Sequence, residues 1–195
     1  MSADRPETAA PRPRRRALFT DRDGTLNPDL HYLKEAERLE LFRGVADAVA
    51  LAHRHGYLVI CVTNQSGVDR GLYTREDVER IHRRLNERLR AQGAEVDAFY
   101  YCPHAPDRRC SCRKPGTQLF EDARQDWNLE LTSSAIVGDR SLDVEAGQRL
   151  GLLTALVPSR NPDSESAREH AQESGRADIV AGSFENAVLR ILARG

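Results

Sequence analysis

The sequence predicts an α/β fold in which a doubly wound parallel β-sheet carries helices on both faces. Apolar runs of four to six residues recur along the chain, and such short runs are typical of buried strands in a parallel sheet. Between them lie stretches whose apolar residues repeat at helical spacing. This alternation indicates right-handed strand–helix–strand crossovers, and hence a Rossmann-like architecture.

The expected elements follow one another along a single domain. We expect strands at 17–20, 57–62, 96–101, 134–137 and 152–157, with an edge strand at 178–180. We expect helices at 44–55, 74–92, 117–127 and 184–192, and one more that leaves 138–143 and ends near 150. Gly56 is a helix stop, and Thr74 is an N-cap with Asp77 three residues later. Residues 27–40, 102–115 and 159–176 are expected to be loops or surface excursions.

Length and composition limit the possible partners. The 195 residues, 39% of them hydrophobic, suffice for one domain with a substantial core, which we place at 17–195. Residues 1–16 are rich in Pro, Ala and Arg and are expected to form a disordered arm, with a small anion-binding arm as the alternative. The net charge of -1 and the lack of a long apolar run predict no nucleic-acid or membrane partner. We expect a cytoplasmic monomer.

Three of the four cysteines lie close together, between positions 102 and 112. Cys102, His104, Cys110 and Cys112 supply three thiolates and one imidazole, the ligand set of a closed tetrahedral zinc site. Because the surrounding loop has no strand or helix signal, a metal would hold its shape. The alternative is a set of free thiols beside a surface histidine. Cys61 falls within an expected strand and reads as a core residue.

Two acidic residues, Asp21 and Asp23, directly follow the first expected strand, in the segment Asp-Arg-Asp-Gly-Thr. At the carboxyl end of a parallel strand this spacing aims both carboxylates into the crevice where open α/β sheets bind ligands. Two acids held so close repel each other and need a cation such as Mg²⁺, which prefers oxygen ligands. The alternative is a solvated turn, because Asp and Gly are common in turns.

Two further strands also end in polar clusters, Thr63 with Asn64 and Asp139 with Asp143, and Lys114 lies between them in the chain. Phosphoryl transfer needs this combination of carboxylates, hydrogen-bond donors and a cation. One carboxylate attacks phosphorus, a metal and a cation neutralise the phosphoryl oxygens, and a second carboxylate moves the proton. For the Asp139–Asp143 pair alone, a helix N-cap is the alternative.

These motifs, in this order, resemble the four motifs of the haloacid dehalogenase superfamily of phosphatases, over residues 18–158. The resemblance implies that Asp21 is the nucleophile and Asp23 the general acid/base. It implies an Mg²⁺ site formed by Asp21, Asp139 and the backbone carbonyl of Asp23. Thr63 and Lys114 would stabilise the phosphoryl group, and Asp143 would orient its neighbours.

The cysteine loop, Cys-x-His followed by Cys-x-Cys-Arg-Lys-Pro, resembles a subgroup without a large cap domain. This subgroup includes the D-glycero-D-manno-heptose-1,7-bisphosphate 7-phosphatases and the histidinol-phosphate phosphatases. Thr-Asn-Gln-Ser-Gly, followed by Arg70-Gly71, is similar to the heptose enzymes. The implied substrate-binding residues are Asp29, Tyr32, Thr63, Asn64, Gln65, Ser66, Arg113, Lys114 and Arg140. Two features depart from the heptose pattern: His31 replaces a usual Gly, and only five residues separate His104 from Cys110, as in the histidinol-phosphate branch.

The resemblance therefore implies a phosphatase that uses Mg²⁺ and is stabilised by Zn²⁺. It would remove the C7 phosphate of heptose 1,7-bisphosphate, a small phosphorylated sugar, through an aspartyl-phosphate. A histidinol-phosphate or other small sugar-phosphate phosphatase is the enzymatic alternative. A catalytically silent zinc-binding scaffold is the alternative from another class, but such a domain would be free to lose Asp23 or Lys114, and both are present.

Overall fold

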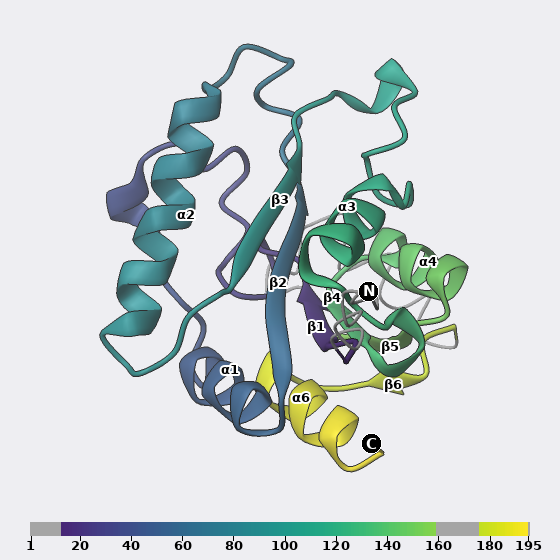
Figure 1. Ribbon diagram of the computed structural model, residues 1–195. Coiled ribbons are helices and arrows are strands. Elements are labelled where there is room, and N and C mark those ends of the chain that lie inside the picture. Colours follow the sequence, from purple (N-terminus) through teal and green to yellow (C-terminus); the bar gives the residue numbers. More distant parts are fainter. Residues whose placement is uncertain (1–12, 159–175, 195) are drawn as a thin grey trace, which may run out of the picture.

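The computed structural model describes residues 13–158 and 176–194. Six strands form one parallel sheet in the order β3-β2-β1-β4-β5-β6 (Figure 1). They are β1 (Arg16–Thr20), β2 (Tyr57–Asn64), β3 (Ala98–Cys102), β4 (Ala135–Gly138), β5 (Leu153–Leu156) and β6 (Ile179–Val180). The strand order reverses between β1 and β4, and the crevice at such a switch point is where doubly wound sheets bind ligands.

Helices cover both faces of this sheet (Figure 1). Helices α1 (Val45–Arg54), α2 (Arg75–Arg90) and α6 (Phe184–Leu192) pack on one face, and α3 (Gln118–Trp127) and α4 (Ser141–Leu150) on the other. In the described ranges, three short 3₁₀ helices, η1 (Ala36–Arg38), η2 (Pro106–Arg108) and η3 (Leu131–Ser133), lie within the loops. The doubly wound arrangement is therefore confirmed.

The central strand β1 shows why its sequence is apolar without interruption. Leu18 belongs to the core cluster under α1, α2 and α6, whereas Ala17 and Phe19 belong to the cluster under α3 and α4. The Phe19 ring meets the ring of Phe120 edge-on, with centroids 5.0 Å apart. Because both faces of the strand are covered, consecutive residues are buried, which removes the alternation of a half-exposed strand.

The observed elements differ from the expected ones mainly at their ends. β2 continues through Thr63 and Asn64, because these residues pair with Tyr101 and Cys102 of β3. β1 begins at Arg16, so the end of the stretch 1–16 already pairs with the sheet. Residues 1–12 and most of the polar stretch 159–176 lie outside the described residues. In the part of the chain that is described, no helix is long and apolar enough to cross a bilayer.

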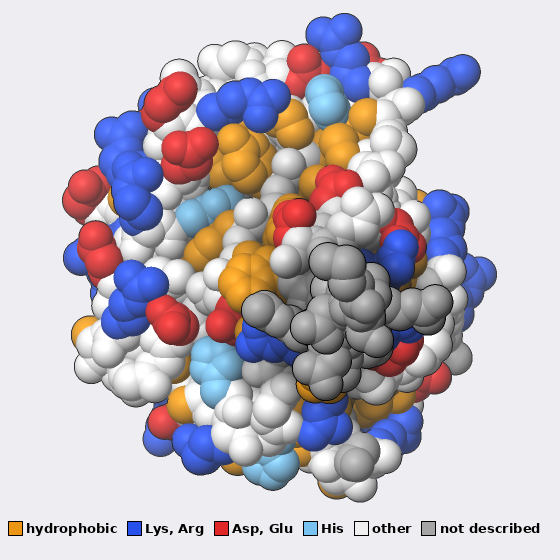
Figure 2. All heavy atoms as spheres, in the orientation of Figure 1, with side chains coloured by type: hydrophobic (Ala, Val, Ile, Leu, Met, Phe, Trp, Pro, Cys, Tyr) orange, Lys and Arg blue, Asp and Glu red, His pale blue; other side chains and the backbone are white. Residues whose placement is uncertain are grey.

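The surface over α2 carries charges of both signs. Figure 2 shows Lys and Arg side chains interspersed with Asp and Glu over this helix. Several of them pair along the helix, Arg80 with Asp77 and Arg84 with Glu87, the latter at 3.0 Å. At its amino end Thr74 is the expected N-cap, and with Asp77 it forms a capping box, in which each side chain accepts a hydrogen bond from the other residue's backbone.

Candidate active site

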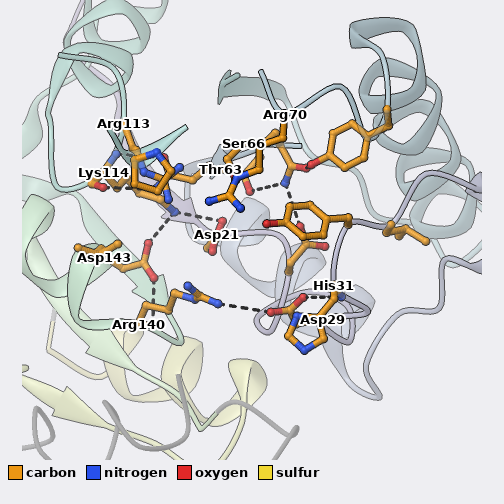
Figure 3. A pocket seen from close by; sticks show the side chains of 18 residues that line it. Asp21, Asp29, His31, Thr63, Ser66, Arg70, Arg113, Lys114, Arg140 and Asp143 are labelled. Carbon is orange, nitrogen blue, oxygen red and sulfur yellow. Dashed lines mark hydrogen bonds and ion pairs between the residues drawn. The ribbon is translucent and has the colours of Figure 1, made fainter. Parts of the chain in front are cut away.

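Lys114 lies at the centre of a polar site at the carboxyl ends of β1 and β4. Its Nζ is 3.0 Å from Asp21 Oδ1 and 2.6 Å from Asp143 Oδ1, and it donates a hydrogen bond to the Val62 carbonyl at 2.7 Å (Figure 3). Burial alone would lower the pKa of Lys114, but Asp143 and Asp21 outweigh it and raise that pKa. The lysine is therefore held as a cation against the predicted nucleophile.

Asp139 provides two buried oxygen atoms that accept no hydrogen bond from any described residue. Its carboxylate lies with those of Asp21 and Asp143 in a group whose ligand atoms are all within 4.8 Å of one another. Burial, together with the charges of Asp21 and Asp143, raises the pKa of Asp139 well above its usual value. Unpartnered, crowded carboxylate oxygens are the donor set that a hard divalent cation prefers.

Gly24 makes this crowding sterically possible. Its φ of +85° is a backbone conformation that favours glycine, and an added Cβ would lie 2.2 Å from Asp139 Oδ2. The glycine that follows the two acids thus serves both the turn and the close approach of the β4 carboxylate to the β1 loop.

The side chain of Asp23 is clamped by three neighbours. Arg22 contacts both of its oxygens, at 3.1 and 2.7 Å, while Asn27 donates to Oδ1 and Gln65 to Oδ2, each at 2.9 Å. Burial tends to raise the pKa of Asp23, but Arg22, Asn27 and Gln65 together lower it. The free protein therefore holds Asp23 as an oriented carboxylate, consistent with a role in proton transfer.

Residues at the end of β2 hold other parts of the site in place. Asn64 brackets the backbone of Lys114: its Oδ1 accepts from the Lys114 N–H at 3.0 Å, and its Nδ2 donates to the Lys114 carbonyl at 3.3 Å. Gln65 donates to Thr63 Oγ1 at 3.1 Å and accepts from the Tyr73 hydroxyl at 2.8 Å. Asn64 therefore positions a cation from the distant cysteine loop.

These residues line a cavity of about 280 Å³ (Figure 3). Its lining comprises Asp21, Asp23, Asp29, His31, Tyr32, Leu33, Thr63, Asn64, Gln65, Ser66, Arg70, Tyr73, Pro106, Arg113, Lys114, Arg140, Leu142 and Asp143. At the rim, Arg140 Nη2 lies 3.5 Å from Asp29 Oδ2, and Asp29 Oδ1 accepts from the His31 N–H at 3.0 Å. The cavity therefore combines carboxylates at the base with guanidinium groups around the mouth.

A second cluster lies beside this cavity, in the loop between β3 and α3. The ligand atoms of Cys102, His104, Cys110 and Cys112 lie within 4.8 Å of one another, with individual separations of 3.1 to 3.6 Å. Their sulfurs are too far apart for disulfides, whose S–S length is about 2.05 Å. Zinc–sulfur bonds of about 2.3 Å in a tetrahedron would separate sulfurs by about 3.8 Å. Three thiols and one imidazole at these separations fit a structural zinc.

Comparisons with known proteins identify the family. A HAD-hydrolase-like family model matches residues 111–187. D-glycero-beta-D-manno-heptose-1,7-bisphosphate 7-phosphatase of Rhodopseudomonas palustris is 39% identical over 147 residues, which cover 72% of this chain and 82% of that relative. The same-named protein of Helicobacter pylori is 36% identical over 75% of this chain and 86% of its own length.

The chain belongs to the HAD-like hydrolase family. Among the solved structures, a D,D-heptose 1,7-bisphosphate phosphatase from B. bronchiseptica, complexed with magnesium and phosphate, is similar with a TM-score of 0.81. It is 27% identical, and the similarity covers 92% of this hydrolase and 99% of the bacterial enzyme. The superfamily expected from the four motifs is thus confirmed.

The fold of this HAD-like hydrolase brings the sequence-predicted site residues together. All of the residues predicted to bind substrate or to catalyse line the one cavity, and Asp139 adjoins it. The sequence reasoning gave no role to Arg22, Tyr73 or Arg70. Arg22 has a detectable signal, because a charged residue between two site acids, directly after a strand, must be solvated or paired; here it is fully buried against Asp23. Tyr73 and Arg70 reach the cavity through the turn after β2, which the sequence pattern does not place.

Proposed function

We propose that this hydrolase removes the C7 phosphate of D-glycero-D-manno-heptose 1,7-bisphosphate. The observation that carries the proposal is the convergence of Asp21, Lys114 and Asp139 at the switch point of the sheet, in a chain whose curated relatives bear that activity in their names. The small cavity and the described chain, which has no large inserted cap, suit a small phosphorylated sugar. We propose that it acts as a monomer.

Each residue of the site has a part in the proposed reaction. An Asp21 oxygen attacks phosphorus, and the bond between phosphorus and the C7 oxygen breaks. Asp23, after taking up a proton, gives it to the departing sugar oxygen and then accepts a proton from the attacking water. That water breaks the aspartyl-phosphate, which regenerates Asp21 and releases inorganic phosphate. Lys114 and the Thr63 hydroxyl stabilise the phosphoryl oxygens during both steps.

Two metals complete the proposal. Asp21, Asp139 and the backbone carbonyl of Asp23 hold Mg²⁺, which neutralises charge on the transferring phosphoryl group. The unpartnered oxygens of Asp139 support this assignment. Cys102, His104, Cys110 and Cys112 hold a structural Zn²⁺. Because Arg113 and Lys114 directly follow Cys112, the zinc loop fixes two cations beside the substrate.

Substrate comparison and two variants test this function. We expect the highest kcat/KM for one anomer of heptose 1,7-bisphosphate, and a much lower value for histidinol phosphate, whose cationic imidazole end suits the arginine-lined mouth poorly. We expect Asp21→Asn to abolish turnover. The variant should still fold, and thermal unfolding should show a cooperative transition like that of wild type. Asp23→Asn accumulates phosphorylated protein, detected by mass spectrometry, because the second step lacks its base.

Each outcome separates the alternatives. A higher kcat/KM for histidinol phosphate would assign the chain to that branch. Near-normal turnover by the Asp21→Asn variant would remove the nucleophile assignment. Lack of turnover of every phosphate ester by the zinc- and magnesium-loaded protein would identify a silent scaffold.

A further inference from the structure

The cations around the cavity differ in what they contact. Lys114 pairs with Asp21 and Asp143, and Arg140 lies near Asp29. The guanidinium groups of Arg70 and Arg113, in contrast, have no carboxylate partner among the described residues; Arg113 donates only to the His104 carbonyl, at 3.3 Å. Two guanidiniums directed at a cavity without a carboxylate partner favour an anionic ligand.

Arg70 is placed at the exposed mouth, away from the buried base of the cavity. It lies in the turn between β2 and α2, and its backbone N–H donates to the Ser66 carbonyl at 3.2 Å. Its guanidinium carbon lies 5.9 Å from the centre of the Tyr32 ring, a cation–π contact. In Figure 3 the side chain points toward the interior of the cavity, and it comes from a different element than Arg113.

The residue before it, Asp69, ties this turn to the zinc loop. The Asp69 carboxylate accepts two hydrogen bonds from Arg108, at 2.8 and 3.2 Å, and one from the Ala105 N–H at 3.1 Å. The Asp69 N–H in turn donates to the Pro103 carbonyl at 3.1 Å. The turn that carries Arg70 and the loop that carries Arg113 are therefore connected by backbone and side-chain hydrogen bonds on either side of Asp69.

We propose that Arg70 is a specificity-determining residue that binds the phosphate retained by the product, with Asp69 positioning it. The inference rests on the proposed function. A sugar bisphosphate brings two dianionic groups, and the positive charges of Lys114 and of the Mg²⁺ that the carboxylates would hold serve the one that reacts. The retained phosphate must extend toward the mouth, where Arg70 offers a planar donor fork suited to phosphate oxygens.

Kinetics on two substrates test this role. We compare heptose 1,7-bisphosphate with heptose 7-phosphate, which lacks the retained phosphate, in wild type and in Arg70→Met. For the bisphosphate we expect kcat/KM to fall about 10- to 100-fold, mainly through KM, as for the loss of hydrogen bonds to a charged group. For the monophosphate we expect no more than about a twofold change. Asp69→Asn also lowers kcat/KM for the bisphosphate relative to that for the monophosphate, but by a smaller factor than Arg70→Met does.

Arg75→Met is the matched control, because Arg75 also stacks on an aromatic ring, that of Tyr101 at 6.0 Å, but does not line the cavity. It should leave both substrates unchanged. Equal losses on the two substrates in Arg70→Met, or no loss on either, would overturn the role of Arg70. Failure of the wild-type protein to hydrolyse the bisphosphate would instead overturn the proposed function, and the inference with it.

Discussion

At the scale of single residues, the geometry of the site depends in part on Arg22, a side chain that contacts Asp23 and is not itself a predicted site residue. Among the described residues Arg22 is the largest fully buried side chain, and it contacts both oxygens of Asp23. Such a charge is tolerated in the interior only because it is paired. The orientation of the predicted acid/base is therefore set by a residue between the two site aspartates that does not itself line the cavity.

Gly24 supports a prediction about metal binding. Gly24→Ala should weaken Mg²⁺ affinity about tenfold or more, because the new Cβ would displace the Asp139 carboxylate. Gly56→Ala is a matched control, since Gly56 has a similar φ of +78° and nothing within 4 Å of an added Cβ. Both variants should lose about 1–2 kcal/mol of stability from the backbone conformation. Calorimetric Mg²⁺ titration of both variants decides; equal affinities would contradict the steric role of Gly24.

His82 is buried in α2 and stacks on Phe99, with ring centroids 4.4 Å apart. Burial, with a further contribution from Arg22 that Asp23 partly opposes, lowers its pKa to about 3. Between about pH 6.5 and pH 3, His82 is protonated in the unfolded chain but neutral in the folded chain. The free energy of unfolding therefore falls as the pH falls through this range.

From this shift we expect His82 to remove about 2 kcal/mol of stability between pH 6.5 and pH 5. His82→Phe keeps an aromatic ring but cannot titrate, and it should lose correspondingly less stability over this interval. Urea unfolding at pH 6.5 and pH 5 measures the difference, with the exposed His55→Gln variant as control. Asp23 keeps its charge throughout, since its pKa is lowered. The same pH dependence in His82→Phe and wild type would contradict the assignment.

At the scale of elements, the zinc loop is the least regular part of the site and the one that carries Arg113 and Lys114. Apart from η2, its conformation depends on the Cys102–His104–Cys110–Cys112 cluster and on the contacts of Asp69 and Asn64. A loop with so little secondary structure of its own should lose its conformation without the metal.

We therefore expect Cys110→Ser to lose zinc and most phosphatase activity, which added Mg²⁺ does not restore. Cys61→Ala is the control, because Cys61 lies in the buried core of β2 and should keep both zinc and activity. Metal analysis and kcat/KM are measured on the same samples. Full activity in zinc-free protein would break the link between this loop and catalysis.

At the scale of the whole molecule, the crowded carboxylates couple metal binding to stability. Asp139→Asn removes a buried charge and should unfold at or above the wild-type temperature without Mg²⁺. Wild type should gain about 2.7 kcal/mol at a hundredfold excess of Mg²⁺ over its Kd, or about 5–10 °C, while the variant gains almost nothing.

Thermal unfolding in magnesium-free and magnesium-containing buffer, without a chelator so that zinc stays bound, measures this difference. Asp107→Asn, at an exposed position, is the control and should respond to Mg²⁺ as wild type does. An equal gain in Asp139→Asn would place the ion elsewhere.

Most of the fold, and most of the residues that line the cavity, could be predicted because their signals are local. Asp21 and Asp23 directly follow a strand. Each of the six expected strand segments overlaps a strand of the structure. The position of Arg22 shows that its charge must be solvated or paired but not which partner it takes, and Tyr73 and Arg70 could not be assigned in this way at all. Their roles depend on which way a side chain turns after the strand and on how a turn packs against a distant loop, and neither is encoded in a short spacing.

The position of β1 has a consequence for synthesis. It is the first of the described strands to leave the ribosome, yet it lies in the middle of the sheet, between β2 and β4. One hydrogen-bonding edge of this apolar strand therefore stays unpaired until residues 135–138 have emerged. Nascent chains that stall before that point expose an edge on which other chains can add, and they are the species a chaperone would have to shield.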